Sequence, residues 1–313
     1  MDFFIVSLLN GAIYGLLLFM VSAGLTLIFG MMGVLNFAHT AFYMIGAYLA
    51  YSLQKVFGFW PAIIISPLIV GVLGAIVERF FLRRVHRYGH AHQLLLTFGL
   101  LIIATELVKL FYGNFPVNYR VPASLDFSAF QVFGADYPFY RLLIGGTSIL
   151  MFVLIYVLLS TTRVGIVVRS AIHKPRMVGA LGHNVPVVFM GVFGVGAALA
   201  GLAGAVAGAF YTTNPNMAMD LAVLVFVVVV VGGLGSLEGA MLSSLLIGLV
   251  SSFAVGVDHS LADLFGLFGA REWAEGIGGL VTLKVSSLAA TTPFLLMLLI
   301  LLFRPSGLMG DRD

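Results

Sequence analysis

The 313-residue sequence contains no cysteine and few charged residues. The absence of cysteine excludes disulfide bonds, thiolate catalysis and cysteine-ligated metal sites. Charged residues make up 9% of the chain, against roughly 25% in soluble domains, and hydrophobic residues make up 61%. Together with a mean hydropathy of +1.10, this composition predicts a helical protein that crosses a membrane many times.

The sequence also lacks the motifs of several enzyme classes. No lysine follows a glycine, which excludes a phosphate-binding P-loop, and there is neither an HExxH motif nor a recognisable Ser-His-Asp set. His86, His90 and His92 lie close together, but Glu78 is the nearest carboxylate, so we expect no metal site there. No basic patch interleaved with aromatic residues points to a nucleic-acid partner.

Long apolar runs recur along the whole chain and indicate an all-α polytopic fold in one transmembrane domain, residues 1–313. The runs are 3–29, 37–56, 61–82, 93–112, 141–160, 187–211, 219–233, 238–257 and 290–303. The first is longer than one crossing needs and rich in glycine, so it is a candidate for a kinked or partly re-entrant helix. The run 219–233 is short and ends in a glycine-rich stretch typical of a broken helix. We therefore expect eight or nine crossings.

The distribution of basic residues predicts the orientation. If all nine runs cross, ten basic residues fall on one side: Arg79, Arg83, Arg84, Arg87, Arg163, Arg169, Lys174, Arg176, Arg304 and Arg312. The other six basic residues fall on the opposite side with most of the acidic ones. Because compact basic loops stay in the cytoplasm, the first side is predicted to be cytoplasmic, with the N-terminus outside and the C-terminus inside.

Two outer loops are long. The loop 113–140 contains three prolines and several aromatic residues, which suits an ordered cap over the outer surface. The segment 258–289 could form an amphipathic helix on the membrane interface, anchored by Trp273. The alternative is a tenth span at 275–289, which would place the C-terminus outside.

The loop 161–186 is basic and lies between two apolar runs. Pro175 is well placed to begin a short helix and Gly182 to end it. That helix would carry an apolar stripe of Met177, Val178 and Leu181, flanked by Lys174 and Arg176. A helix of two turns is too short to be stable alone in water, which favours docking into a groove on another protein. The alternative is a loop that only fixes the topology.

Two glycine-rich breaks resemble each other. Residues 29–38 and 231–240 each join an apolar helix, a glycine-rich turn, a polar residue and a second helix. Paired breaks of this kind indicate an internal repeat and a passage at the repeat interface, although such breaks are also common in membrane helices. The candidate pathway residues are Gly33, Asn36, His39, Gly233, Gly235 and Glu238. Asn36 and His39 share one helical face and could instead pin the break structurally.

The run 187–211 carries small residues at strict four-residue spacing: Gly196, Ala200, Gly204 and Gly208. Such a ridge allows a second helix to approach closely, so it predicts helix packing in the bundle centre or at a dimer interface.

Four segments carry a resemblance to a known family: 24–50, 162–185, 230–249 and 301–310. In these segments the chain resembles the LivH-type permease subunits of bacterial ABC importers for branched-chain amino acids. The resemblance implies a non-catalytic subunit in the bacterial inner membrane, in contact with membrane lipid. It also implies a second, LivM-like permease, two cytoplasmic ATPase subunits that bind ATP and magnesium, and a periplasmic substrate-binding protein. No cofactor is expected on this chain itself.

Within that family, the segment 161–186 is similar to the loop that couples the permease to its ATPase. The implied coupling residues are Arg163, Gly165, Arg169, Lys174, Pro175, Arg176, Met177, Val178, Leu181 and Gly182. The chain departs from the wider superfamily at Ser170-Ala171, where Glu-Ala-Ala is common, and 258–289 is longer than expected. Related permeases move urea or short amides, so the substrate stays open. Whether the functional pair is hetero- or homodimeric also stays open.

The rival interpretation is a secondary transporter or channel that acts alone. It would need an acidic residue at membrane depth to bind a coupling ion, and Glu106 is the main candidate.

Overall fold

The computed structural model describes residues 2–33, 35–132, 134–257 and 283–310, together with Ser260, Asp263, Gly276 and Val281. The predicted interfacial helix around Trp273 lies outside the described residues, as do residues 275, 277–280 and 282 of the possible tenth span at 275–289. The end of that segment forms a 3-10 helix, η4 (Val285–Thr291), which leads into the last long helix.

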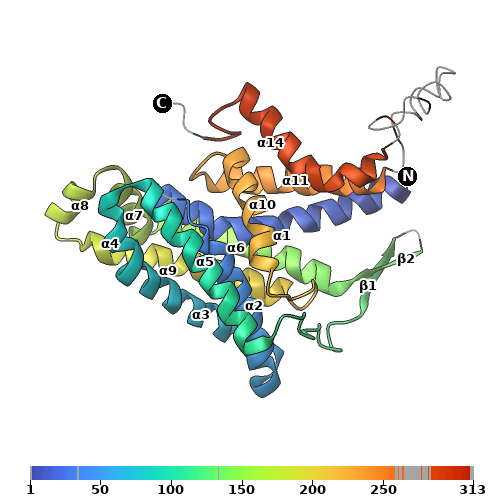
Figure 1. Ribbon diagram of the computed structural model, residues 1–313, viewed down its shortest axis with the longest axis horizontal. Coiled ribbons are helices and arrows are strands. Elements are labelled where there is room, and N and C mark those ends of the chain that lie inside the picture. Colours follow the sequence, from blue (N-terminus) through green and yellow to red (C-terminus); the bar gives the residue numbers. More distant parts are fainter. Residues whose placement is uncertain are drawn as a thin grey trace.

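Within the described ranges, every one of the nine apolar runs forms a helix (Figure 1). These helices are α1 (Asp2–Met32), α2 (Ala38–Phe57), α3 (Phe59–Val77), α5 (His90–Tyr112), α6 (Phe139–Thr161), α9 (Val185–Ala207), α10 (Met217–Gly232), α11 (Leu237–Gly256) and α14 (Thr292–Phe303). Among the described residues, seven helices are long and apolar enough to cross a membrane, and α10 is a shorter apolar helix. The predicted class, a helical polytopic membrane protein, is confirmed.

The first helix does not break. α1 is a single α-helix of 31 residues, so the re-entrant alternative for this run is wrong. Its glycines instead allow a neighbouring helix to pack closely. A methyl group added at Gly15 would lie 2.7 Å from the carbonyl oxygen of Ser244 on α11. Gly11 meets the backbone of the same helix at Leu249. The glycines in α1 therefore allow the close packing of α1 against α11, its most extensive contact.

The least apolar of the long helices lies in the interior. α2 packs against α9, α3 and α5, and it buries His39, Thr40, Tyr43 and Tyr48. A helix that is enclosed by protein does not face lipid, so it can carry polar side chains that would be costly on the outer surface of the bundle.

The small-residue ridge of α9 lies in the bundle centre. Gly196, Ala200, Gly204 and Gly208 are all buried within this chain. A methyl group at Gly196 would lie 2.7 Å from Ile28 on α1, and one at Gly204 would overlap the Tyr43 carbonyl oxygen on α2. The ridge thus brings α1 and α2 into backbone contact with α9.

The loop 113–140 is folded and includes a small hairpin that was not expected from the sequence. β1 (Ser128–Val132) pairs with β2 (Ala135–Pro138) in antiparallel register, with Phe130 opposite Tyr137. Before the hairpin, the Tyr119 hydroxyl donates to the carbonyl of Ala205, near the C-terminal end of α9, at 2.7 Å. Burial raises the pKa of Tyr119, which keeps this hydroxyl protonated as a donor. The loop therefore caps α9, whose last carbonyls need external donors.

The short helices gather at the opposite end of the molecule. Figure 1 shows α4 (Arg83–Val85), α7 (Arg163–His173) and α8 (Pro175–Ala180) at one end, and the hairpin and N-terminus at the other. The chain reaches α4 through a π-helical turn, η1 (Glu78–Leu82), and leaves it through a 3-10 turn, η2 (His86–Tyr88). Most of the predicted cytoplasmic arginines belong to this end.

Candidate functional site

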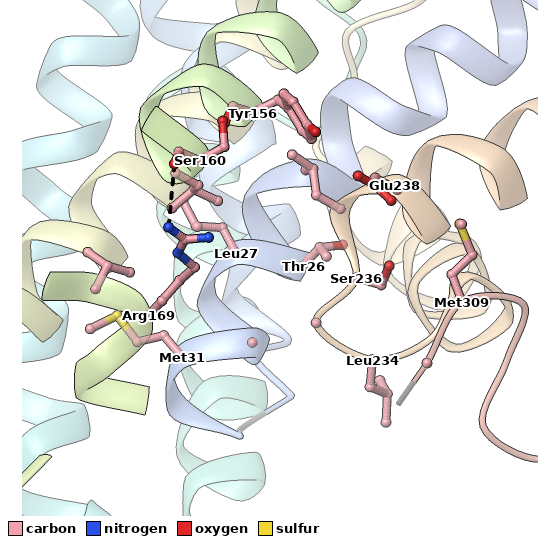
Figure 2. Close-up of a pocket in the computed structure, with 16 residues that line it drawn as sticks. Thr26, Leu27, Met31, Tyr156, Ser160, Arg169, Leu234, Ser236, Glu238 and Met309 are labelled. Carbon is pink, nitrogen blue, oxygen red and sulfur yellow. Dashed lines mark hydrogen bonds between the residues drawn. The ribbon is translucent and has the colours of Figure 1, made fainter. Parts of the chain in front are cut away.

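A cavity of about 530 Å³ lies at the end of the molecule that carries α7 and α8, between α1, α6, α7 and the α10–α11 break (Figure 2). Its apolar lining residues include Leu27, Met31, Leu159, Val168, Leu234 and Leu237. Its polar lining residues include Thr26, Tyr156, Ser160, Arg169, Ser236 and Glu238. The volume is typical of small-molecule sites, which measure roughly 300–1,000 Å³.

Two opposite charges face the cavity from opposite walls. Figure 2 shows Arg169, on α7, beside Ser160, and Glu238 on the far side beside Ser236. The guanidinium of Arg169 makes one long hydrogen bond, from Nη2 to the Ser160 carbonyl at 3.5 Å. Glu238 lies in the first turn of α11, whose N-cap residue Ser236 accepts a bond from the Gly239 amide. Within the described part of the chain, neither charge forms an ion pair.

The two glycine-rich breaks meet at this cavity. A methyl group added at Gly235 would lie 2.9 Å from Cα of Gly30, so the two backbones touch. Gly235 also has a φ of 87°, which an L-residue with a side chain rarely adopts. The predicted pathway residues Gly235 and Glu238 thus belong to one site. The internal repeat itself stays a prediction.

The C-terminal segment closes the α10–α11 break. The amides of Leu308 and Met309 donate to the carbonyls of Val231 and Gly232, at 2.8 and 3.0 Å, and so bind carbonyls that the end of α10 leaves free. Gly233, a predicted pathway residue, packs against the backbone of Gly310 and does not line the cavity. The motif at 301–310 was noted in the sequence, but its contact with the break was not foreseen.

Asn36 and His39 do not line this cavity. The imidazole of His39 is fully buried, and its Nε2 donates to the Val21 carbonyl at 2.8 Å, which pins α2 to α1. Gly24 makes room for the ring, since a methyl group there would lie 2.7 Å from its Cε1. This contact supports the structural role that the sequence left open for His39.

The side chain of Asn36 is 3% exposed and lines a separate cavity of about 10 Å³ beside Thr40 and Phe226. Neither atom of its amide has a hydrogen-bond partner among the described residues. Gly33, the other pathway candidate near this break, has a φ of 63° at the end of α1, and its amide donates to the Phe29 carbonyl at 2.8 Å; it lines neither cavity. The first break therefore contributes Gly30 to the large cavity, not the polar pair Asn36 and His39.

The short helix predicted in the loop 161–186 is present. α8 begins at Pro175, and Gly182, with a φ of 87°, follows its end. The predicted apolar stripe is divided, however: Met177 and Leu181 are 58% and 76% exposed, whereas Val178 is 4% exposed. Val178 faces inward because so short a helix needs one buried face to hold it against the bundle. The exposed tip, which we name the α8 tip, consists of Lys174, Arg176, Met177 and Leu181.

The other predicted coupling residues lie away from the α8 tip. Gly165 forms the tight corner between α6 and α7, where a methyl group would overlap the carbonyl of Leu159. Arg163 lines a separate apolar groove of about 480 Å³ with Val164 and residues of α9. Arg169 faces the large cavity, as described above. The coupling residues predicted from the sequence therefore lie in four distinct places in the structure: the α8 tip, the corner at Gly165, the groove at Arg163 and the large cavity at Arg169.

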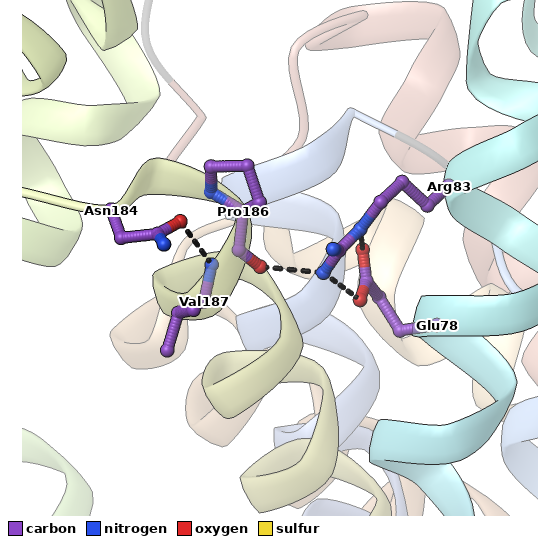
Figure 3. A network of polar contacts seen from close by, with 5 residues as sticks. All are labelled: Glu78, Arg83, Asn184, Pro186 and Val187. Atoms are coloured by element: carbon purple, nitrogen blue, oxygen red, sulfur yellow. Dashed lines mark hydrogen bonds and ion pairs between the residues drawn. The ribbon is translucent and has the colours of Figure 1, made fainter.

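An ion pair between the buried Glu78 and the partly exposed Arg83 anchors the segment after α8 (Figure 3). The carboxylate of Glu78 is 2% exposed and accepts two bonds from Arg83, at 2.7 and 3.2 Å. Nη2 of Arg83 also donates to the carbonyl of Pro186 at 2.7 Å, and Asn184 caps α9 by accepting from the Val187 amide. This network joins the end of α3 to the start of α9.

The same network bears on the histidine cluster. Glu78 is committed to Arg83, and His86 contacts the amide of Gln93 at 3.0 Å. Among the described residues, no group of three histidine or acidic side chains is arranged to hold a metal ion.

Replacing Arg83 by leucine is expected to lower the free energy of unfolding by about 3 kcal/mol, because it leaves the buried Glu78 carboxylate without a counter-charge. The change is measured by unfolding the purified protein in detergent. Adding Glu78→Gln to the Arg83→Leu variant should restore part of the loss, and Arg87→Leu, at an exposed arginine on the same side, should have little effect. Equal losses for Arg83→Leu with and without Glu78→Gln would contradict the assignment.

Comparison with known proteins supports one family for nearly the whole chain. The family described as the branched-chain amino acid transport system / permease component matches residues 7–302. The chain belongs to this family. No solved structure shows significant similarity to this permease.

Three relatives match nearly the full length of the permease at low identity. The high-affinity branched-chain amino acid transport system permease protein BraD of Pseudomonas aeruginosa is 26% identical, over 98% of this chain and 95% of the relative. The permease protein LivH of Salmonella typhimurium is 25% identical, over 99% and 97%. A probable LivH of Methanocaldococcus jannaschii is 28% identical, over 97% and 92%. The predicted LivH-type resemblance is therefore confirmed.

The four segments that carried the resemblance surround the large cavity. Segment 24–50 contributes Thr26, Leu27, Gly30 and Met31, and 162–185 contributes Val168 and Arg169. Segment 230–249 contributes Leu234 to Glu238, and 301–310 contributes Met309 and Gly310. Together with α6, these segments form one site from residues that are spread along the chain between Thr26 and Gly310.

Proposed function

We propose that this permease is the membrane subunit of an ATP-driven importer that moves branched-chain amino acids into the cytoplasm. The observation that carries the proposal is that α7 forms a wall of the large cavity and is joined directly to the exposed α8 tip. A partner that moves the tip would therefore also move the cavity wall. The full-length relatives named for branched-chain amino acid transport support this substrate class.

Two cavities on the same helices support a passage. A second cavity of about 470 Å³ is lined by Tyr14 of α1, Asp220 of α10 and Ser252 of α11, with Pro293 of α14. On α1 it lies about three helical turns from the first cavity, since Tyr14 and Thr26 are twelve residues apart. In the predicted topology, the second cavity is on the outer side and the first on the cytoplasmic side.

An apolar cluster separates the two cavities. Leu18, Val227, Val228, Val231 and Ile247 are fully buried and pack together. Along each helix they lie between the residues that line one cavity and those that line the other: Leu18 lies between Tyr14 and Thr26 on α1. A transport cycle in this permease requires α1, α10 and α11 to separate at this cluster, which seals the passage when it is packed.

The proposed partners are those implied by the family. Two cytoplasmic ATPases hold ATP and magnesium and bind the α8 tip, a second permease of the LivM type completes the membrane part, and a periplasmic binding protein delivers the substrate to the outer loops. The chain itself binds no cofactor and lies in the bacterial inner membrane, with its N-terminus outside.

The rival role as a transporter that acts alone has less support. Glu106, the acidic residue it would need, lies on the surface of α5 and pairs with Lys109 at 2.8 Å. Neither cavity includes it among its lining residues.

Reconstitution tests the proposed function. The tagged permease is purified from its native membrane with the proteins that accompany it and placed in proteoliposomes with the binding protein. We expect two ATPase chains and a second permease to co-purify, and uptake of labelled leucine to require hydrolysable ATP. Uptake that proceeds without ATP, or purification of a transport-active chain alone, would overturn the proposal. Urea or amide uptake in place of leucine uptake would reject the substrate class.

A further inference from the structure

We propose that the large cavity binds the transported amino acid as a zwitterion, with Arg169 contacting its α-carboxylate and Glu238 its α-ammonium group. This inference rests on the proposed function and names the groups that recognise the substrate. It uses residues of two elements, α7 and α11, that the sequence did not place together.

The charges of the cavity carry the inference. Arg169 and Glu238 face it from opposite walls (Figure 2), and within the described ranges neither has an ionic partner. Most other lining side chains are apolar or bear a hydroxyl. A site for a neutral apolar solute needs no charged side chain, and a site for a simple ion needs side chains of the opposite charge only. One cation and one anion across a largely apolar cavity match a ligand that carries both charges.

The local hydrogen bonds leave both charged groups available. Among the described contacts, Arg169 makes only the 3.5 Å hydrogen bond to the Ser160 carbonyl. Most of the five N–H donors of its guanidinium therefore remain for a ligand. A guanidinium can bind a carboxylate with two parallel hydrogen bonds. Thr26 and Ser236, by contrast, are neutral and partly engaged: the Thr26 hydroxyl donates to the Ser22 carbonyl, and the Ser236 hydroxyl oxygen accepts from the Gly239 amide. The charged pair therefore provides the stronger recognition.

The apolar walls complete the match. Leu27, Met31, Val168 and Leu237 line the same cavity and would contact an aliphatic side chain. Urea and short amides carry no net charges and no such side chain, so this site selects against them. Because Arg169 belongs to α7, movement of the α8 tip would change the separation of Arg169 and Glu238 and weaken the two contacts together.

Analogues of leucine test each contact separately. Binding is measured by calorimetry on the complete transporter in lipid nanodiscs without the binding protein, using leucine, leucinamide, which lacks the carboxylate, and 4-methylpentanoate, which lacks the ammonium group. The wild-type complex should prefer leucine to either analogue by about tenfold or more, the value of one charge-assisted hydrogen bond of roughly 1.5–3 kcal/mol. The variants are Arg169→Gln and Glu238→Gln, with Arg79→Gln, at an exposed arginine outside the cavity, as the control.

We expect the Arg169→Gln variant to lose most of the preference for leucine over leucinamide. It should keep the preference for leucine over 4-methylpentanoate. Glu238→Gln should show the reverse pattern, and Arg79→Gln should match the wild type. If both cavity variants keep both preferences, or lose both equally, the inference is wrong. ATP-driven leucine uptake is recorded for the wild-type complex from the same purification, placed in proteoliposomes with the binding protein. Its absence would reject the proposed function, whereas its presence with unchanged analogue preferences would reject this inference alone.

Discussion

Replacing Gly204 by alanine is expected to lower the free energy of unfolding by about 3 kcal/mol and to abolish transport. The added methyl group would overlap the carbonyl oxygen of Tyr43 and lie 3.0 Å from the amide nitrogen of Ala47, both on α2. These are backbone atoms of a buried helix, so no side chain can move aside to relieve the overlap. α2 and α9, which are in extensive contact, would have to separate.

The matched control is Gly146→Ala, the same substitution at a helical glycine of α6 that has no atom within 4 Å of the added methyl group. There the change should be neutral or stabilise the helix by roughly 0.5–1 kcal/mol, because alanine restricts the unfolded chain more than glycine does. Unfolding of both variants in detergent measures the difference. Equal stability of the two would show that α2 and α9 are not in backbone contact.

Reversing the charge of the α8 tip is expected to reduce ATP-driven uptake by more than tenfold without loss of stability. In the variant Lys174→Glu, Arg176→Glu, two exposed basic residues beside the exposed Met177 and Leu181 become acidic. If an ATPase covers this tip, the reversed charges are buried against a surface complementary to positive charge, at a cost of roughly 2–5 kcal/mol. Because the side chains are exposed in this chain alone, its own fold should be unaffected.

The control for this prediction is Arg84→Glu, Arg87→Glu, which makes the same change in net charge at exposed arginines of the same end of the molecule. Uptake of labelled leucine, substrate-stimulated ATP hydrolysis and the amount of co-purified ATPase are measured for both variants. Normal uptake and hydrolysis in the Lys174→Glu, Arg176→Glu variant would show that the α8 tip is not the coupling site. This conclusion would hold whatever the Arg84→Glu, Arg87→Glu variant does.

Sequence reasoning was most successful where the signal is local. The apolar runs identified the helices because a membrane-spanning segment must be long and hydrophobic, whatever its neighbours are. Pro175 and Gly182 marked α8 within one residue because they act through their own backbone angles. The hairpin β1–β2 was missed, since it is short and depends on packing against the ends of α1 and α6.

The assignment of single residues to roles was less successful, because it depends on which face a side chain presents. Val178 was grouped with Met177 and Leu181 by spacing, but the bundle buries it and leaves the other two exposed. Arg169 was placed with the docking residues and instead faces the cavity. Asn36 was grouped with Glu238, yet the two line different cavities.

By itself, the sequence determined that this protein is a helical membrane protein, where its helices lie and, through four separate motifs, to which family it belongs. These properties follow from hydrophobicity, from backbone preferences and from the order of short segments, none of which requires a knowledge of contacts. Only the tertiary structure decided that the four motifs meet around one cavity and that Arg169 faces Glu238 across it. The reason is physical: glycines such as Gly30, Gly204 and Gly235 permit close approach of backbones, but which backbones meet depends on the packing of the whole bundle.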